Sequence, residues 1–231
     1  MSGAAAGALI YRVEGAVATI AFNRPQVMNA LDAQSLIDLR DVCERARGDS
    51  NVRVIVLRGQ GPAFVAGGDI AWFHANLHAM DTRVPEMAGA LHAAIRALRS
   101  AAKPVLACVH GAVAGAGMSL LAAADLAIAA AETKFSTAYC AATALRLGLV
   151  NRVVPAAALD AATATLSQRL AAGPTRAYAE TKALVNRSFE TPLAAQLDAE
   201  AAAFGRCTAT QDFAEGVTAF VEKRKATFEG R

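Results

Sequence analysis

Two glycine-rich turns are the segments of this sequence whose residue types and spacing could do chemistry. Residues 63–70 read Ala-Phe-Val-Ala-Gly-Gly-Asp-Ile, and residues 110–117 read His-Gly-Ala-Val-Ala-Gly-Ala-Gly. Each turn joins a predicted buried strand to a predicted helix, so its backbone N–H groups lack partners at a helix N-terminus. Two such turns aimed at one point would make an oxyanion hole, and their small residues would admit a planar group such as a thioester.

Other interpretations of these turns stay open at this stage. Both could be ordinary strand–helix turns, which glycine content alone favours. A dinucleotide site is a weaker competitor, because the second turn has no GxGxxG pattern and no earlier strand–turn–helix carries one. Asp69 is expected to cap the following helix, and His110 to be structural. The other titratable side chains near the first turn are expected to be solvated: His74, His78, Asp81 and Glu86.

Composition argues against several other classes of protein. The 231 residues are 55% hydrophobic and 19% charged, and a net charge of +3 is too weak to indicate nucleic-acid binding. The four cysteines have no CxxC spacing and form no cluster with histidines, so reduced thiols and no metal centre are expected. The apolar stretch 104–131 contains Asp125, which opposes a membrane span, and the N-terminus lacks the features of a signal peptide. We therefore expect a cytoplasmic protein.

Hydrophobic periodicity predicts an α/β protein in which strand and helix units precede a helical tail. A hairpin of strands 11–13 and 16–22 is expected first, and Asp32 should cap a helix that ends near residue 47. Further strands are expected at residues 52–57, 105–109, 125–130 and 149–154. Further helices are expected at residues 69–79, 85–100, 156–171, 174–187, 192–204 and 211–228.

Several short motifs follow one another over nearly the whole chain. They are Asn23-Arg24-Pro25 with Asn29-Ala30-Leu31, residues 66–70, Lys103-Pro104-Val105, residues 110–117, 125–129, 148–154 and 220–225. No single motif is decisive, but in this order and spacing they resemble the enoyl-CoA hydratase/isomerase (crotonase) family. The resemblance implies a ClpP/crotonase spiral of ββα units in residues 1–155 and a helical region in residues 156–231.

The resemblance also implies what the protein binds. An acyl-CoA thioester would be the ligand, with no cofactor apart from the coenzyme A of the substrate and no nucleic-acid or membrane partner. The helical region would form a homotrimer or a dimer of trimers.

Site residues follow from the same resemblance. The thioester oxygen would lie between the backbone N–H groups of Gly68 and Ala116. The adenine end of coenzyme A would lie near Ala30 and the carbonyl of Ala66, and Lys223 would reach a phosphate, with a surface lysine as the alternative. The first turn would contribute further binding residues: Gly67, Asp69 and Ile70.

The sequence departs from the family at both positions where a hydratase has glutamate. Those positions match Ser119 and Tyr139. Hydration needs a carboxylate base for the water and a group that delivers a proton to the α-carbon. A serine without a histidine partner is no substitute, and a tyrosine with a reference pKa of about 10 is a poor base at neutral pH. Neither position supports a hydratase mechanism.

A second departure lies between Cys140 and Leu147. The family usually has a few tens more residues here, whereas in this sequence residues 141–144 join directly to residues 145–148 without a turn residue. We expect the native protein to hold a further segment at this join. In isomerase-like relatives an aspartate or glutamate of that loop is the single acid/base.

Double-bond isomerisation, or a related reaction through a thioester enolate, is therefore the predicted activity. The alternative is a non-catalytic acyl-CoA-binding protein of the same fold. A CoA-ester hydrolase or decarboxylase is also open, since one fold hosts several chemistries.

Overall fold

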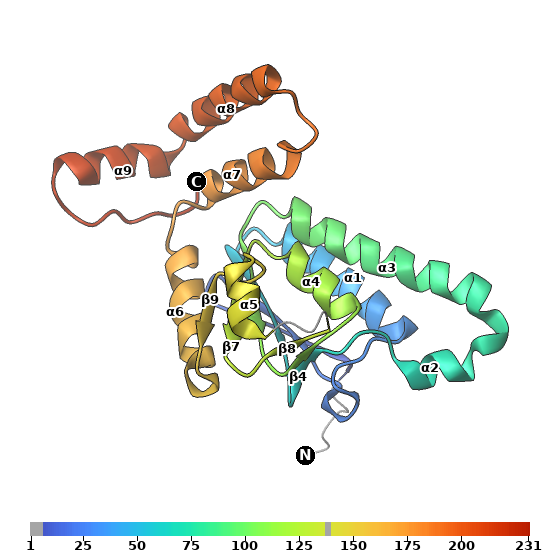
Figure 1. The fold of residues 1–231 in the computed structure, drawn as a ribbon. Coiled ribbons are helices and arrows are strands. Elements are labelled where there is room, and N and C mark those ends of the chain that lie inside the picture. Colours follow the sequence, from blue (N-terminus) through green and yellow to red (C-terminus); the bar gives the residue numbers. More distant parts are fainter. Residues whose placement is uncertain (1–6, 137–139) are drawn as a thin grey trace, which may run out of the picture.

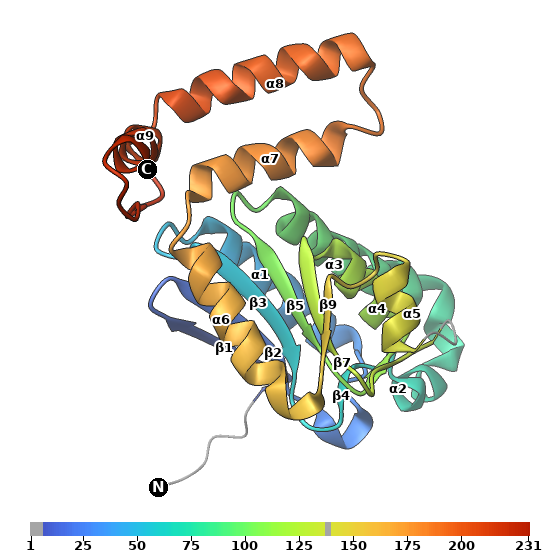
Figure 2. The same cartoon turned by 60° about the vertical axis from the view of Figure 1, so that its left-hand side comes forward.

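A six-stranded sheet forms the centre of the molecule. The computed structural model describes residues 7–136 and 140–231, and Figures 1 and 2 show helices on both faces of the sheet. Every neighbouring pair of strands is parallel except the β1–β2 hairpin. In spatial order the strands are β1 (Leu9–Glu14), β2 (Val17–Phe22), β3 (Val54–Gly59), β5 (Val105–Val109), β7 (Leu126–Ala130) and β9 (Arg152–Val154).

A second, parallel sheet has three very short strands. They are β4 (Ala63–Val65), β6 (Ala112–Val113) and β8 (Lys134–Phe135). Each follows a strand of the large sheet after a short turn, and helices follow β4 and β6. The chain therefore adds one strand to each sheet in every repeat, which confirms the expected spiral of ββα units.

The large sheet is buried on both faces. Ile55 and Leu57 of β3 contribute to one core, while Val54 and Val56 contribute to the other, as the two-residue period of a strand requires. Full burial of each such side chain contributes about 2 kcal/mol. The first face is covered by α1 (Ala33–Gly48), α3 (Met80–Ser100) and α4 (Ala116–Ala123), and the second by α6 (Leu159–Ala171).

Most predicted elements are confirmed, with shifted bounds. Asp32 caps α1 as expected, in a capping box with Ser35. The helix after the first turn is short, because α2 (Ile70–Ala75) gives way to the 3₁₀ turn η2 (Leu77–Ala79). α3 begins at Met80 and runs through Pro85, at the cost of a helical hydrogen bond. No helix of the described residues is long and apolar enough to cross a membrane.

The C-terminal helices form an extension beyond the sheet (Figure 1). They are α7 (Thr175–Arg187), α8 (Leu193–Thr208) and α9 (Gln211–Val221). The expectation of one helix over residues 211–228 is wrong after Val221, because the backbone turns at Lys223 with φ 56°. The remaining residues return to the body, where Arg53 donates a 3.0 Å hydrogen bond to the carbonyl of Phe228.

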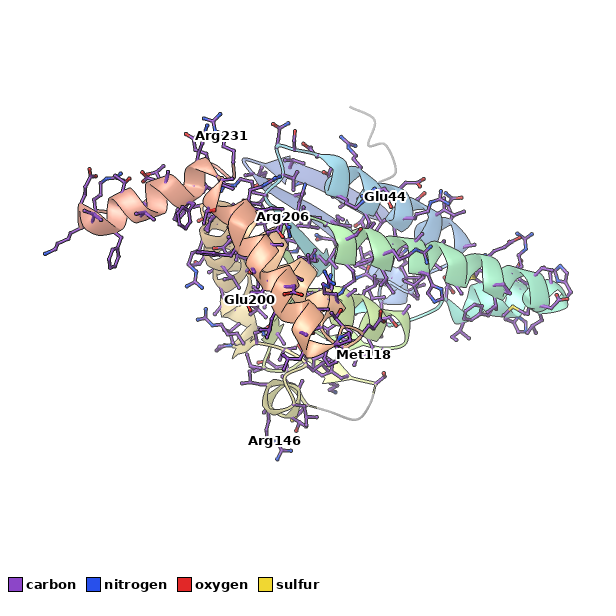
Figure 3. All side chains as sticks on the ribbon, turned by 90° about the horizontal axis from the view of Figure 1, so that it is seen from above. Glu44, Met118, Arg146, Glu200, Arg206 and Arg231 are labelled. Carbon is purple, nitrogen blue, oxygen red and sulfur yellow. The ribbon has the colours of Figure 1, made fainter. Side chains whose placement is uncertain are left out.

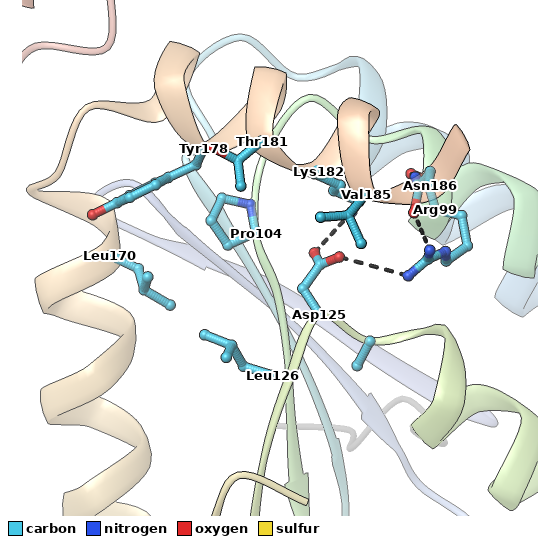
Figure 4. A pocket seen from close by; sticks show the side chains of 11 residues that line it. Arg99, Pro104, Asp125, Leu126, Leu170, Tyr178, Thr181, Lys182, Val185 and Asn186 are labelled. Atoms are coloured by element: carbon cyan, nitrogen blue, oxygen red, sulfur yellow. Dashed lines mark hydrogen bonds and ion pairs between the residues drawn. The ribbon is translucent and has the colours of Figure 1, made fainter. Parts of the chain in front are cut away.

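One buried lysine attaches α7 to the body. Lys182 Nζ donates to the carbonyl oxygens of Leu98 (2.7 Å) and Lys103 (3.3 Å) and lies 2.9 Å from Asp125 Oδ2. Burial lowers the pKa of Lys182, and the Asp125 carboxylate opposes that shift. The pair borders a cavity of about 390 Å³ between α7 and the sheet, with Arg99 beside it (Figure 4).

We expect Lys182→Met to lower the free energy of unfolding by about 3 kcal/mol, because it removes the ammonium group that pairs with a half-buried carboxylate and donates to two buried carbonyl groups. Urea unfolding measures this effect. Arg206→Met is the matched control, since it breaks the exposed pair with Glu180 on the same extension and should cost less than about 1 kcal/mol. Equal costs for the two variants would contradict the assignment of Lys182 as the anchor of α7.

Candidate functional site

The first glycine-rich turn lies between β4 and α2. Gly67 has φ +107°, a backbone conformation that residues with a side chain rarely adopt. Asp69 caps α2 as the sequence predicts, because its Oδ1 accepts hydrogen bonds from the backbone N–H groups of Ala71 (3.0 Å) and Trp72 (3.1 Å). The turn is thus fixed on its C-terminal side by the helix that it begins.

Backbone hydrogen bonds hold the first turn against residues 28–31. Leu31 N–H donates to Gly67 O (2.8 Å), and Asp69 N–H donates to Leu31 O (3.0 Å). Ala66 N–H donates to Met28 O (3.1 Å). Among residues 7–136 and 140–231, Gly68 N–H has no acceptor, and Gly68 is partly exposed. Its amide is therefore available to a ligand.

The second turn has the same property. Gly115 (φ +49°) precedes α4, and Ala116 is the first residue of that helix. A first helical residue has no intrahelical acceptor for its N–H, and the described part of the chain supplies no other acceptor for Ala116 N–H. The next amides are used, since Gly117 donates to Ala114 O (2.8 Å) and Met118 to Gly115 O (2.9 Å).

The two turns are in backbone contact. Ala114 N–H donates to Val65 O (3.0 Å), which joins β6 to β4. A Cβ atom on Gly67 would lie 3.7 Å from Gly115 Cα, and one on Gly117 would lie 2.2 Å from Val65 O. The structure thus brings the turns of Gly68 and Ala116 together, each with an amide that has no acceptor among the described residues. This arrangement can stabilise negative charge on a bound carbonyl oxygen.

The side chains around the turns offer little for proton transfer. Ser119 lies on α4 and is exposed, and Tyr139 lies outside the described residues. Asp69 is the only carboxylate in residues 63–75 and 110–123, and both of its oxygens accept hydrogen bonds. His110 Nε2 lies 2.8 Å from Gly61 O, in agreement with a structural role.

The predicted coenzyme A contacts are only partly brought together. Ala30 and Ala66 lie on the two hydrogen-bonded segments of the first turn, and Ile70 is 74% exposed beside it. Lys223 follows α9, whereas α2 lies at the opposite end of the molecule (Figures 1 and 3). Within a single chain, Lys223 therefore lies far from the turns. The contact of Lys223 with a phosphate stays a prediction.

Sequence reasoning gave no role to Arg24, which the structure places at the first turn. Its Nη2 atom lies 2.8 Å from Asp69 Oδ2 and 3.1 Å from Asp32 Oδ2. An arginine shortly after a strand, beside a proline, was the available signal, but Asp69 is distant in sequence. Within the described residues, no three histidine, cysteine or acidic side chains gather as metal ligands.

The join after Cys140 is helical. Residues Ala141–Arg146 form α5, with Ala141 and Ala144 fully buried, and Cys140 pairs with Lys134 in an isolated bridge. This stretch needs no turn residue because the chain continues through it as a helix. A further segment in the native protein stays a prediction.

We expect Gly117→Ala to separate the turns and to lower the free energy of unfolding by about 2 kcal/mol, because the added methyl group would overlap the Val65 carbonyl. Gly89→Ala is the matched control. Gly89 lies on α3 with open space around it, so this variant should be stabilised by about 1 kcal/mol. Urea unfolding distinguishes the two, and a stable Gly117→Ala variant would contradict the close contact.

Comparisons with known proteins agree with this geometry. The family model described as enoyl-CoA hydratase/isomerase matches residues 12–141 and 135–231. A crotonyl-CoA hydratase from Syntrophomonas wolfei is 32% identical over 255 aligned positions, which cover 95% of this chain and 97% of that protein. A trans-2-decenoyl-[acyl-carrier-protein] isomerase from Streptococcus mutans is 27% identical, with coverage of 96% and 98%.

A solved structure supports the same conclusion. The crystal structure of an enoyl-CoA hydratase from Polaromonas sp. JS666 superposes with a TM-score of 0.90 at 27% identity, covering 96% of this chain and 100% of that chain. Because the family model spans nearly the whole sequence and the fold agrees, the chain belongs to the enoyl-CoA hydratase/isomerase family.

Proposed function

We propose that the chain binds an acyl-CoA thioester with the carbonyl oxygen between the N–H groups of Gly68 and Ala116. The observation that carries this proposal is the contact of two turns, each of which presents an amide without an acceptor in residues 7–136 and 140–231. Removal of a proton from the α-carbon gives an enolate whose charge resides on that oxygen. Amides fixed by the fold stabilise this charge without reorganisation.

The proposed reaction is double-bond isomerisation or a related proton transfer. One acid/base group removes a proton from one carbon and returns it to another, so a second carboxylate is not required. Ser119 in place of the first family glutamate argues against hydration. The named isomerase among the relatives supports proton transfer as a reaction that this kind of chain performs.

The acid/base is proposed to come from a segment between Cys140 and Leu147. The family model matches in two parts, which overlap over residues 135–141. The alignment with the Syntrophomonas wolfei hydratase has 255 positions, whereas this chain has 231 residues, so the alignment contains gaps in this chain. An intact mass of the native protein a few kilodaltons above 23.8 kDa would support this source. A mass equal to 23.8 kDa would contradict it.

The alternative function is non-catalytic binding of acyl-CoA. It is favoured by the one carboxylate of the two turns, Asp69, whose oxygens are already occupied. Under either function, coenzyme A of the ligand is proposed as the only cofactor and the cytoplasm as the location.

A homotrimer or a dimer of trimers is proposed as the assembly. The C-terminal extension exposes large apolar side chains that water would otherwise contact: Phe189 (96% exposed), Leu193 (75%), Phe204 (63%) and Phe220 (85%). A second copy of the chain would cover them.

The function is tested with a panel of crotonyl-CoA, a 3-enoyl-CoA and malonyl-CoA, together with α-proton exchange of a saturated acyl-CoA in deuterated water. We expect binding of the thioesters, conversion of the 3-enoyl to the 2-enoyl thioester and α-proton exchange. Binding without turnover or exchange would favour the non-catalytic alternative. Absence of thioester binding, or rapid hydration of crotonyl-CoA, would overturn the proposal.

Ala116→Pro tests the oxyanion donor itself. Proline removes the N–H and is tolerated at the first position of a helix, so exchange and turnover should fall about 10²-fold or more while the fold persists. Gln211→Pro is the matched control, because Gln211 is the first residue of α9, away from the turns. Equal activity of Ala116→Pro and the unaltered protein would contradict the role of the Ala116 N–H as an oxyanion donor.

A further inference from the structure

Arg24 contacts three residues around the first turn. Its guanidinium lies 2.8 Å from Asp69 Oδ2 and 3.1 Å from Asp32 Oδ2 through Nη2. Its Nη1 donates a 2.6 Å hydrogen bond to the carbonyl oxygen of Ala30. Only 20% of this side chain is exposed. The guanidinium fork can make these bonds in one plane, which an ammonium group cannot do.

The carboxylate of Asp69 transmits this contact to the turn. Oδ2 faces Arg24, and Oδ1 accepts the amides of Ala71 and Trp72. Burial by itself raises the pKa of Asp69, but the hydrogen bonds from Trp72 and Arg24 lower it overall. Asp69 therefore stays ionised in a fixed orientation, directly after Gly68.

The segment on which the turn rests is also fixed from the Arg24 side. Asn29 is buried with φ +58°, and its Nδ2 donates to Gln60 O (2.9 Å) and Ala63 O (2.7 Å). Its Oδ1 accepts the backbone N–H of Arg24 (2.8 Å). Residues 24–31 thus form a rigid support, to which Gly67 and Asp69 are joined by the backbone bonds of Leu31.

We propose that Arg24 is a positioning residue for the Gly68 amide. By joining Ala30 O to the Asp69 carboxylate, it fixes both sides of the peptide unit whose N–H faces the bound carbonyl. In this role Arg24 acts through Asp69 and not by contact with the substrate. This inference rests on the proposed oxyanion role of Gly68.

The test uses acetoacetyl-CoA, whose enolate absorbs in the near ultraviolet, on the full-length protein. The unaltered protein should bind it as the enolate, whereas Arg24→Gln should bind the enolate about 10²-fold more weakly, because small misplacements of a donor have effects of this size. Affinity for coenzyme A alone, which has no carbonyl at the site, should fall much less than affinity for the enolate. Arg24→Lys should recover part of the effect.

A double-mutant cycle with Asp69→Asn checks the route of the effect. Because Arg24 acts through this carboxylate, the Arg24→Gln/Asp69→Asn variant should be no weaker in enolate binding than the worse single variant. Arg58→Gln is the matched control: it breaks an Arg–Asp pair with Asp160 on the α6 face of the sheet and should leave enolate binding unchanged. Unchanged enolate binding in Arg24→Gln, or equal losses for the enolate and for coenzyme A, would overturn the inference.

A measurement without ligand separates this inference from the proposed function. Hydrogen–deuterium exchange of the peptide over residues 66–72 should accelerate in Arg24→Gln and stay unchanged in Arg58→Gln. Failure of the unaltered protein to bind the enolate, with accelerated exchange in Arg24→Gln, would overturn the proposed function alone. Unchanged exchange in Arg24→Gln would overturn the positioning role.

Discussion

The backbone contact between the two turns is the constraint on which the rest of the structure depends. Gly117 lies so close to the Val65 carbonyl that a methyl group would overlap it, and Gly67 and Gly115 occupy left-handed conformations. Only residues without side chains satisfy both requirements. The short strands β4 and β6 are parallel and hydrogen-bonded, so they deliver both turns to the same edge. The spiral of ββα units is the means by which two distant segments present their amides together.

Two cation–carboxylate pairs secure the parts that the backbone alone does not fix. Arg24 and Asp69 hold the first turn, while Lys182 and Asp125 hold α7 near the start of β5, where Asp125 Oδ2 also accepts Val105 N–H at 2.8 Å. The free energy needed to desolvate such charges is similar to the free energy that their attraction contributes. These pairs are therefore weak sources of net stability. Their directional hydrogen bonds instead select one placement of each segment. The same type of interaction therefore fixes the first turn in one case and attaches α7 to the body in the other.

Local patterns in the sequence were sufficient for the main elements and for the two turns. The strand over residues 105–109 and the cap at Asp32 were predicted because each depends on neighbours in sequence. Strands β4, β6 and β8 were missed because two or three residues show no periodicity. The end of α9 was missed because it depends on the tail, where Glu215 pairs with Arg224 at 2.7 Å. The contact of Arg24 with Asp69 was missed for a similar reason, since the two residues are 45 positions apart.

The proposed enolate chemistry has two halves, one assigned to the backbone and the other to side chains. In the proposed reaction, stabilisation of the oxyanion would come from the amides of Gly68 and Ala116, which belong to turns that the packing fixes. Proton transfer would depend on side chains, and Ser119 is exposed on α4, so we expect substitutions at this position to leave those turns undisturbed. A change at this position can therefore remove hydration and leave the electrophilic half intact. Such a chain would still polarise a thioester, and its reaction would be decided by whichever acid/base reaches the α-carbon.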